Sequence, residues 1–141
     1  MQKMKLYPKG FIFSDESLPK LPNYYKLETF LDTYNYWYDE DMCATTFEHK
    51  ESFIIIHGEY VHIGIDNQFT EKGLLKHLLM SFHQDYDNFL DIMDYIAGRY
   101  AIIIGDRNNV FVYPDASNTR TIYYSTKHQS IASHVYLLKD Q

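Results

Sequence analysis

The side chains of this sequence that could carry out chemistry are one thiol and a short segment containing histidine. Cys43 is the only cysteine in the 141 residues, so an internal disulfide is excluded. His57, Gly58 and Glu59 directly follow the apolar run 53–56. A thiolate is a nucleophile, and an imidazole can act as a base, a hydrogen-bond donor or a metal ligand. These residues are the candidates for catalysis and binding.

Histidine and carboxylate side chains near position 60 are of the types that bind transition metals. In a strand, however, His57 and Glu59 point to one face and His62 points to the other, with Asp66 further along the chain. No helical H-x-x-x-H or H-E-x-x-H spacing occurs. The later acidic segment lacks the central glycine and terminal glutamate of a calcium loop (Asp85, Asp87, Asp91 and Asp94). We therefore expect no metal site and no cofactor.

Cys43 would carry a free α-amine, as an N-terminal nucleophile requires, only if the chain were cut after Met42. That cut would remove the first predicted strand, which begins near Gly10. Cysteine otherwise behaves as a small hydrophobic residue and is among the most buried residue types. A buried, unreactive Cys43 is the favoured interpretation, and we expect no catalytic residue.

The composition is that of a globular protein, with 45% apolar and 23% charged residues. A net charge of −6 with scattered lysines and arginines disfavours nucleic-acid binding, which needs a cationic surface. There is no run of 18 apolar residues to span a membrane, and the N-terminal residues do not form a secretory signal. Together with the single cysteine, this indicates a cytoplasmic protein that contacts neither nucleic acid nor membrane.

Apolar and aromatic runs predict several strands in the first half of the chain, at 10–14, 36–38, 45–48 and 53–56. Residues 26–35 fit either a short helix or an extended segment. Residues 39–41 are acidic and are expected to turn toward solvent. We expect His57 and Gly58 to end the strand 53–56, and residues 60–65 to pair back on it.

Two helices are expected between these strands and the next ones. Thr70 is a suitable N-cap, and apolar residues then recur at helical spacing (Leu74, Leu75, Leu78, Leu79 and Phe82). Residues 85–88 form the predicted break. A second, shorter apolar stripe follows (Phe89, Leu90, Ile92, Met93 and Ile96), and Gly98 is expected to stop the helix.

The last third returns to strands, expected at 100–104, 110–113, 121–125 and 130–132, before a final helix begins. The turn at 114–120 is interpreted as held by an Asp115–Arg120 ion pair and an Asx-type hydrogen bond. His128 and His134 are expected to be solvated. Strands, then two helices, then strands predict an α+β fold with mostly antiparallel sheets, in a single domain of residues 1–141.

Several of these segments, in order, resemble the glutaminase domain of asparagine-synthetase-like proteins. FIIIHGEY at 53–60 resembles the family strand that ends in Asn-Gly-Glu, and Gly98-Arg99-Tyr100 resembles the start of its "G-x-F/Y" strand. Residues 113–120, YPDASNTR, resemble the turn R-D-x-x-G-x-R/K. Ile122-Tyr123-Tyr124 resembles P-L-Y-Y, and Ile131-Ala132-Ser133 resembles F-A-S. The resemblance is clearest over residues 53–138.

Two departures from the family pattern bear on chemistry. The family nucleophile is an N-terminal cysteine whose own α-amine is the base, whereas this chain begins Met1-Gln2. The family Asn-Gly pair supplies an oxyanion hole, and His57 stands at the Asn position. Cysteine-less members of the family match this pattern better. In them, the domain resembles a structural remnant beside an ATP-using amide-forming domain.

The resemblance therefore implies an Ntn-hydrolase-like fold of stacked antiparallel sheets with two helices, and a catalytically inactive pseudoenzyme. Its expected role is a scaffold or docking module for an asparagine-synthetase-like, ATP-dependent amide-forming protein in a biosynthetic pathway. The alternative is an amino-acid-binding or regulatory module that uses a vestigial glutamine pocket at His57, Gly58 and Glu59. The family has further strands beyond the position of Gln141, so a trimmed or minimal version is implied. Its exposed sheet edges would favour a partner protein or a homodimer.

Overall fold

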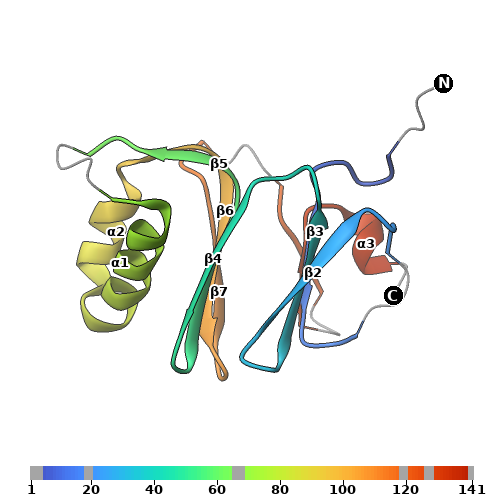
Figure 1. Ribbon diagram of the computed structural model, residues 1–141, viewed down its shortest axis with the longest axis horizontal. Coiled ribbons are helices and arrows are strands. Elements are labelled where there is room, and N and C mark those ends of the chain that lie inside the picture. The colour runs from blue at the N-terminus through green and yellow to red at the C-terminus, as the bar shows by residue number, and fades with distance from the viewer. Residues whose placement is uncertain (1–4, 18–20, 65–68, 118–120, 126–128, 140–141) are drawn as a thin grey trace. The chain divides into compact units, whose positions relative to one another are not determined.

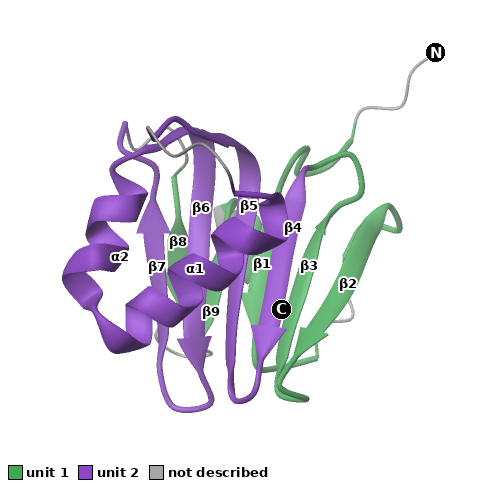
Figure 2. Cartoon of the chain, turned by 60° about the vertical axis from the view of Figure 1, so that its left-hand side comes forward, with its two compact units in different colours: residues 1–42, 121–141 green, residues 43–120 purple. Residues whose placement is uncertain are grey.

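The computed structural model describes residues 5–17, 21–64, 69–117, 121–125 and 129–139, and it has an α+β architecture (Figure 1). The chain forms two compact units (Figure 2). Unit 1 combines residues 1–42 with 121–141, and unit 2 is the continuous segment 43–120. Each unit has its own antiparallel sheet. The α+β class with antiparallel sheets is thus confirmed, while the single-domain organisation stays a prediction.

Unit 1 is a five-stranded sheet in the order β2-β3-β1-β9-β8, with a short helix, α3 (Val135–Lys139). Its strands are β1 (Phe11–Ser14), β2 (Tyr25–Phe30), β3 (Tyr34–Asp39), β8 (Tyr123–Ser125) and β9 (Ser130–Ala132). The central strand β1 is buried at every position and pairs with β3 on one side and β9 on the other. The C-terminal segment therefore closes a sheet that the N-terminal segment begins. Residues 26–35, for which the sequence fits either a short helix or an extended segment, are extended: they form most of β2, a turn and the start of β3.

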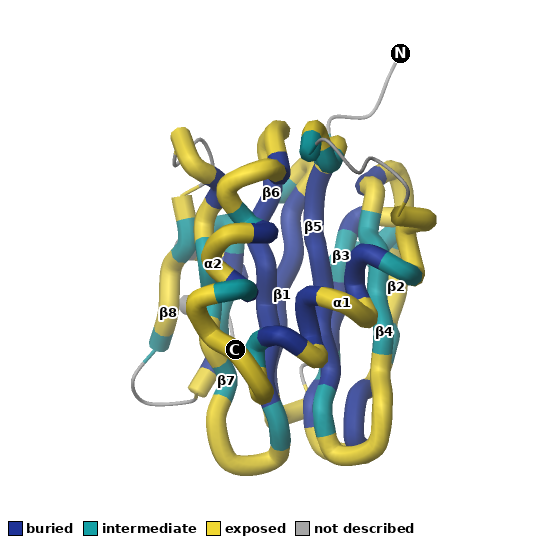
Figure 3. The backbone as a smooth tube through the Cα atoms, turned by 90° about the vertical axis from the view of Figure 1, so that its left-hand side faces the viewer, coloured by how far each residue is buried: buried dark blue, intermediate teal, exposed yellow. Residues whose placement is uncertain are grey.

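Unit 2 is a four-stranded sheet in the order β4-β5-β6-β7, with two helices. The strands are β4 (Ala44–His49), β5 (Ser52–His62), β6 (Ile96–Asp106) and β7 (Val110–Pro114), and the helices are α1 (Glu71–Gln84) and α2 (Tyr86–Met93). The helices pack their apolar stripes on the sheet face that carries Ile54, Ile56 and Tyr100. The central strands β5 and β6 are buried over most of their length (Figure 3).

Local chemistry explains the boundaries of the two helices. The Thr70 side chain accepts a hydrogen bond from the Gly73 amide at 3.0 Å, which satisfies an otherwise unpaired donor at the start of α1. The predicted break at 85–88 is narrower, because Asp85 alone ends α1 and caps α2 by accepting from the Asn88 amide at 3.2 Å. The second helix ends at Met93, and Gly98 lies inside β6, so the prediction that Gly98 stops the helix is wrong.

Two further expectations are corrected. His57 and Gly58 do not end a strand, because β5 continues to His62 and pairs with β6 along its whole length. Residues 60–62 therefore pair with 96–98, not with 53–56. Asp39 does not turn to solvent, because it is the buried last residue of β3, while Glu40 and Asp41 are exposed.

Asp39 is buried but has several hydrogen-bond donors around its carboxylate. The amide groups of Lys9 and Asp41 donate to its two oxygens at 2.8 and 3.0 Å, and the Lys5 ammonium lies 3.3 Å from Oδ1. Burial by itself raises the pKa of Asp39, but the two amide donors and Lys5 outweigh it and hold the pKa below its usual range. The carboxylate therefore ties the N-terminal segment to the end of β3 in its charged form.

We expect Asp39→Asn to destabilise the protein by about 1–3 kcal/mol, because an amide cannot accept from both backbone donors. The folded pKa is lowered, so the contribution of Asp39 is complete above the unfolded pKa of about 3.9 and is lost as pH falls through the folded value. Urea unfolding at several pH values measures both effects. Glu40→Gln, at the exposed next residue, is the control. Equal stability of the two variants at pH 7 would contradict this role for Asp39.

Candidate functional site

The three residues of the predicted vestigial pocket lie in succession on β5 but have different environments. His57 is fully buried, Gly58 is buried and Glu59 is exposed. Ile54 and Ile56 face the helices, so alternation along the strand places His57 on the opposite sheet face. The side chain of His57 thus lies on the sheet face opposite the helices, whereas the next two residues line a cavity described below.

Gly58 has a backbone conformation that requires glycine. Its φ is +128°, and an added Cβ would overlap the Arg99 carbonyl oxygen and come within 2.8 Å of the Tyr100 Cα. Gly98, on the facing strand, has a φ of +138° and would meet the Tyr60 Cα at the same 2.8 Å. The two glycines flank the directly opposed pair of residues 59 and 99. The β5 and β6 backbones therefore approach closely at this point.

Three of the segments that resemble the glutaminase family, at 57–60, 98–100 and 114–117, meet around Tyr100. Its register partner on β5 is Gly58. The Tyr100 amide donates to Asp115 Oδ2 at 3.1 Å, and the Asp115 amide donates back to the Tyr100 carbonyl at 3.1 Å. The other carboxylate oxygen of Asp115 accepts from the Ser117 amide at 3.1 Å, which is the expected Asx-type hydrogen bond. Arg120, its predicted ion partner, lies outside the described residues.

Two tyrosine hydroxyls near the site are held in their neutral form. Burial raises the pKa of Tyr100 to about 12, and its hydroxyl donates to the Ile96 carbonyl at 3.1 Å. Burial also raises the pKa of Tyr60, whose hydroxyl lies 2.7 Å from the Thr45 hydroxyl. The rings of Tyr60 and Tyr100 meet edge to face at 6.4 Å. At neutral pH these phenols can donate hydrogen bonds but cannot act as bases.

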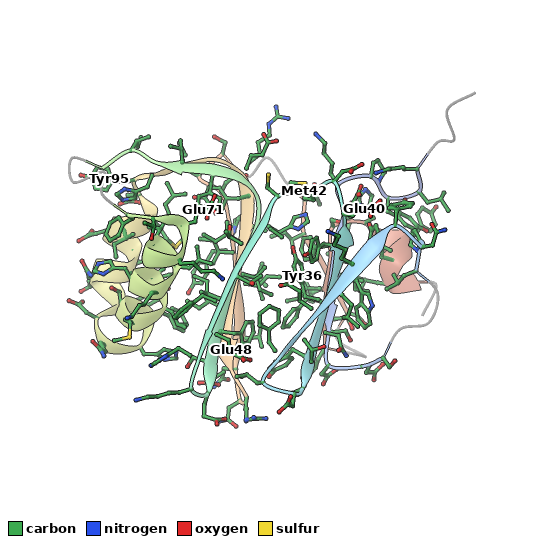
Figure 4. The ribbon with its side chains drawn as sticks, in the orientation of Figure 1. Tyr36, Glu40, Met42, Glu48, Glu71 and Tyr95 are labelled. Carbon is green, nitrogen blue, oxygen red and sulfur yellow. The ribbon has the colours of Figure 1, made fainter. Side chains whose placement is uncertain are left out.

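A cavity of about 430 Å³ opens beside Gly58. Its walls come from the start of β4, from the middle of β5 and from the first turn of α1, and they include Cys43, Thr45, Gly58, Glu59, Tyr60 and Glu71. Glu71 lies at the end of α1 nearest to β5 (Figure 4). The Gly58 amide donates to the Cys43 carbonyl at 2.9 Å, which fixes the floor of the cavity. We call this cavity the Gly58 pocket.

The chemistry of the Gly58 pocket is set by two carboxylates, a thiol and two hydroxyls, and none of the described residues in its wall is cationic. Such a wall favours ligands that carry an amine or other hydrogen-bond donors. Cys43 is exposed, so the prediction that it is buried is wrong. Its nitrogen is part of the peptide chain after Met42, so it provides no α-amine beside the thiol.

Several residues of the pocket were not expected from the sequence. The sequence favours a buried Cys43, and its pattern gives no binding role to Thr45, Tyr60 or Glu71. A signal was present, because the strands 44–49 and 52–57 are joined by a two-residue turn. That pairing places Cys43 opposite Gly58. The contribution of Glu71 depends on how α1 packs, which the sequence pattern does not specify.

The other candidates from the sequence do not converge. Within the described residues, no group of three or more histidine, cysteine or carboxylate side chains could hold a metal ion. Asp66 and His128 lie outside those residues. His134 is not simply solvated, because its Nδ1 lies 2.7 Å from the Ser133 hydroxyl and its ring contacts Tyr7.

None of the described helices is both long enough and apolar enough to cross a membrane. Comparisons with models of protein families, with curated protein sequences and with solved structures found no significant match to this chain.

We expect Gly58→Ala to destabilise the protein by at least about 2 kcal/mol, because the methyl group would be forced into the β6 backbone at a left-handed φ. Denaturant unfolding followed by tryptophan fluorescence and circular dichroism measures the loss. Glu59→Ala, at the exposed next residue, controls for the site and should cost less than about 0.5 kcal/mol. If the two variants are equally stable, the two strands do not approach closely at Gly58.

Proposed function

We propose that this chain is a glutaminase-like domain without catalytic activity, with an Ntn-hydrolase-like fold. In this proposal it serves in the cytoplasm as a scaffold or docking module for an asparagine-synthetase-like, ATP-dependent amide-forming protein of a biosynthetic pathway. The observation that carries the proposal is the meeting of three of the five family-like segments at Tyr100. Segments 57–60, 98–100 and 114–117 come together there through register pairing and the Asp115 carboxylate.

This arrangement supports the proposal because the matching positions perform structural tasks that depend on their identity. Gly58 and Gly98 permit a close approach of two backbones, and Asp115 satisfies an amide at the end of the β6–β7 ladder. These are the positions at which the sequence keeps the family pattern. The position that departs from the pattern, His57, has its side chain buried away from the pocket.

The absence of catalysis is proposed from the groups around the Gly58 pocket. Cys43 is an internal residue without a free α-amine, so it lacks the base that the family mechanism places on the nucleophile itself. His57 does not line the cavity, so it does not supply a hydrogen bond at the Asn position of the oxyanion hole. Loss of one such donor typically lowers the rate by ~10²–10³.

A second candidate function is amino-acid binding or regulation at the former glutamine site. It is favoured by one observation, the 430 Å³ cavity at Gly58 and Glu59. The carboxylates of Glu59 and Glu71 are suited to hold the α-amino group of an amino acid. The described residues of the wall include no cation to match an α-carboxylate, so a ligand that bears an amine without a carboxylate would suit it better.

To test the docking function, the reading frames beside this gene are searched for an amide-forming synthetase with a Ser-Gly-Gly-x-Asp loop, and a protein found in this way is mixed with the chain. We expect a complex in size-exclusion chromatography with light scattering at micromolar concentration. We also expect no ammonia release from glutamine above the rate of the Cys43→Ser variant. The absence of a complex at tens of micromolar contradicts docking. Ammonia release that Cys43→Ser abolishes contradicts an inactive domain.

To test ligand binding, unfolding is measured with glutamine, asparagine and the diamine putrescine. A ligand at 100 times its Kd stabilises the native state by about 2.7 kcal/mol. We expect any stabilisation to be lost in Glu71→Gln, because that carboxylate lines the pocket, and to persist in Glu48→Gln, an exposed β4 residue outside it. If all three compounds leave the melting temperature unchanged, the pocket is not a site for these ligands.

A further inference from the structure

The strand β7 is the outer strand of the unit 2 sheet on the side of α2 (Figure 2). None of its five residues, VFVYP, is charged. Edge strands are usually protected by charged side chains, because their unpaired backbone groups attract other strands. The other long edges follow that rule, since β2 carries Lys26 and Glu28 and β4 carries Glu48.

The opposite edge of the same sheet is also protected by α1. The amide of Gly58 bonds to the carbonyl of Cys43, so residues 44, 46 and 48 of β4 direct their backbone groups outward. The Lys72 ammonium donates to the Thr46 carbonyl at 2.7 Å, which occupies one of these outward acceptors. The β7 edge has no such side chain among the described residues.

The hydrogen bonds at the two ends of the β6–β7 pairing show which residues of β7 direct their backbone groups toward β6 and which direct them outward. The Asp106 amide donates to the Asn109 carbonyl at 2.9 Å, and the Asp115 amide donates to the Tyr100 carbonyl at 3.1 Å. In an antiparallel pair the bonded residues alternate, so residues 109, 111 and 113 bond toward β6. Val110, Val112 and Pro114 therefore direct their backbone groups toward the open edge. Only the two valines offer an amide there, because proline has none.

An exposed aromatic surface continues from this edge onto the helices. Phe111 is 45% exposed and its ring lies 5.4 Å from that of Phe82. Tyr86 is 46% exposed, and its hydroxyl lies 2.9 Å from that of Tyr113. Phe111 and Tyr113 share one sheet face, so this surface would be extended by any strand that pairs with β7.

We propose that β7 pairs with β7 of a second copy of this chain, antiparallel and centred on Val112. In that register the two Val112 residues exchange two hydrogen bonds, and each Val110 amide donates to the Pro114 carbonyl of the other copy. Both outward amides are then satisfied. Because Pro114 has no amide, it cannot donate to the Val110 carbonyl of the other copy. That carbonyl is the only outward group left without a partner in this pairing, and it lies at the end of the paired segment, where water can reach it.

The side chains favour the same twofold arrangement. Phe111 of one copy stands directly opposite Tyr113 of the other, on the face that carries the helices, and such aromatic pairs stabilise adjacent strands. The absence of charge on β7 means that a twofold axis brings no like charges together, although the chain carries a net −6. In a second copy, the residue that lacks an amide, Pro114, falls opposite Val110 through the symmetry itself. A strand of a different protein would have this fit only by chance. The inference does not depend on the proposed function.

The test is a disulfide across the axis. The Cα atoms of a hydrogen-bonded pair lie about 5.5 Å apart, within the range that a disulfide spans. In a Cys43→Ser background, we expect Val112→Cys to form a covalent dimer under mild oxidation at least tenfold faster than Leu27→Cys. Leu27 is 52% exposed on the outer strand β2 of the unit 1 sheet, so it is a matched control. Equal rates, or faster linkage through Leu27→Cys, overturn the proposal.

A second measurement avoids any effect of the cysteines on folding. We expect the wild-type chain to sediment as a dimer at tens of micromolar, and Phe111→Lys to sediment as a monomer with native circular dichroism. Leu27→Lys should remain a dimer. A wild-type chain that stays monomeric up to about 200 µM, or a Phe111→Lys dimer of unchanged Kd, overturns the proposal.

Discussion

The close approach of β5 and β6 at Gly58 and Gly98 is the constraint on which unit 2 depends. Each glycine leaves room for the backbone of the facing strand, so one uninterrupted antiparallel ladder runs from Ser52 to His62. A side chain at either position would push the strands apart where Tyr100 enters the core. Because Tyr100 also anchors Asp115, the same contact fixes where β7 leaves β6. The backbone geometry at two residues thus organises three strands.

This constraint separates structural positions from positions exposed to ligands. The His57 side chain is buried, whereas the next two residues of β5, Gly58 and Glu59, line the Gly58 pocket. An imidazole without solvent contact is a poor proton carrier. Tyr100, whose pKa is raised to about 12 by burial, stays protonated at neutral pH and therefore cannot accept a proton. The groups that remain accessible in the Gly58 pocket are suited to bind cations and donors. They are less suited to activate a nucleophile.

The sequence predicts helices and strands well where apolar residues recur at a regular spacing. It predicts them less well where the conformation of a single residue decides whether an element ends or continues. The leucine stripe of α1 and the strand 100–104 needed only hydrophobic spacing, and both were expected. Gly58 and Gly98 were expected to end elements, because glycine often does so. In both cases it permits a distorted strand to continue, and only the facing backbone shows this. Asp39 was expected at the surface because a carboxylate without visible partners belongs there. Two of its three partners, Lys5 and Lys9, are 34 and 30 residues away in sequence, and only the Asp41 amide is local.

The two edges of the unit 2 sheet differ in a way that follows from helix placement. α1 lies near β4, where Lys72 can occupy an outward carbonyl and where the Gly58 pocket forms beneath Glu71. On the side of α2, the surface next to the edge is formed by tyrosine and phenylalanine rings, and β7 has no charged residue. A charged edge with a cavity suits a small ligand, and an uncharged edge flanked by rings suits a strand. One sheet can therefore hold a ligand site and a protein contact on opposite edges, and pairing at β7 would leave the Gly58 pocket open.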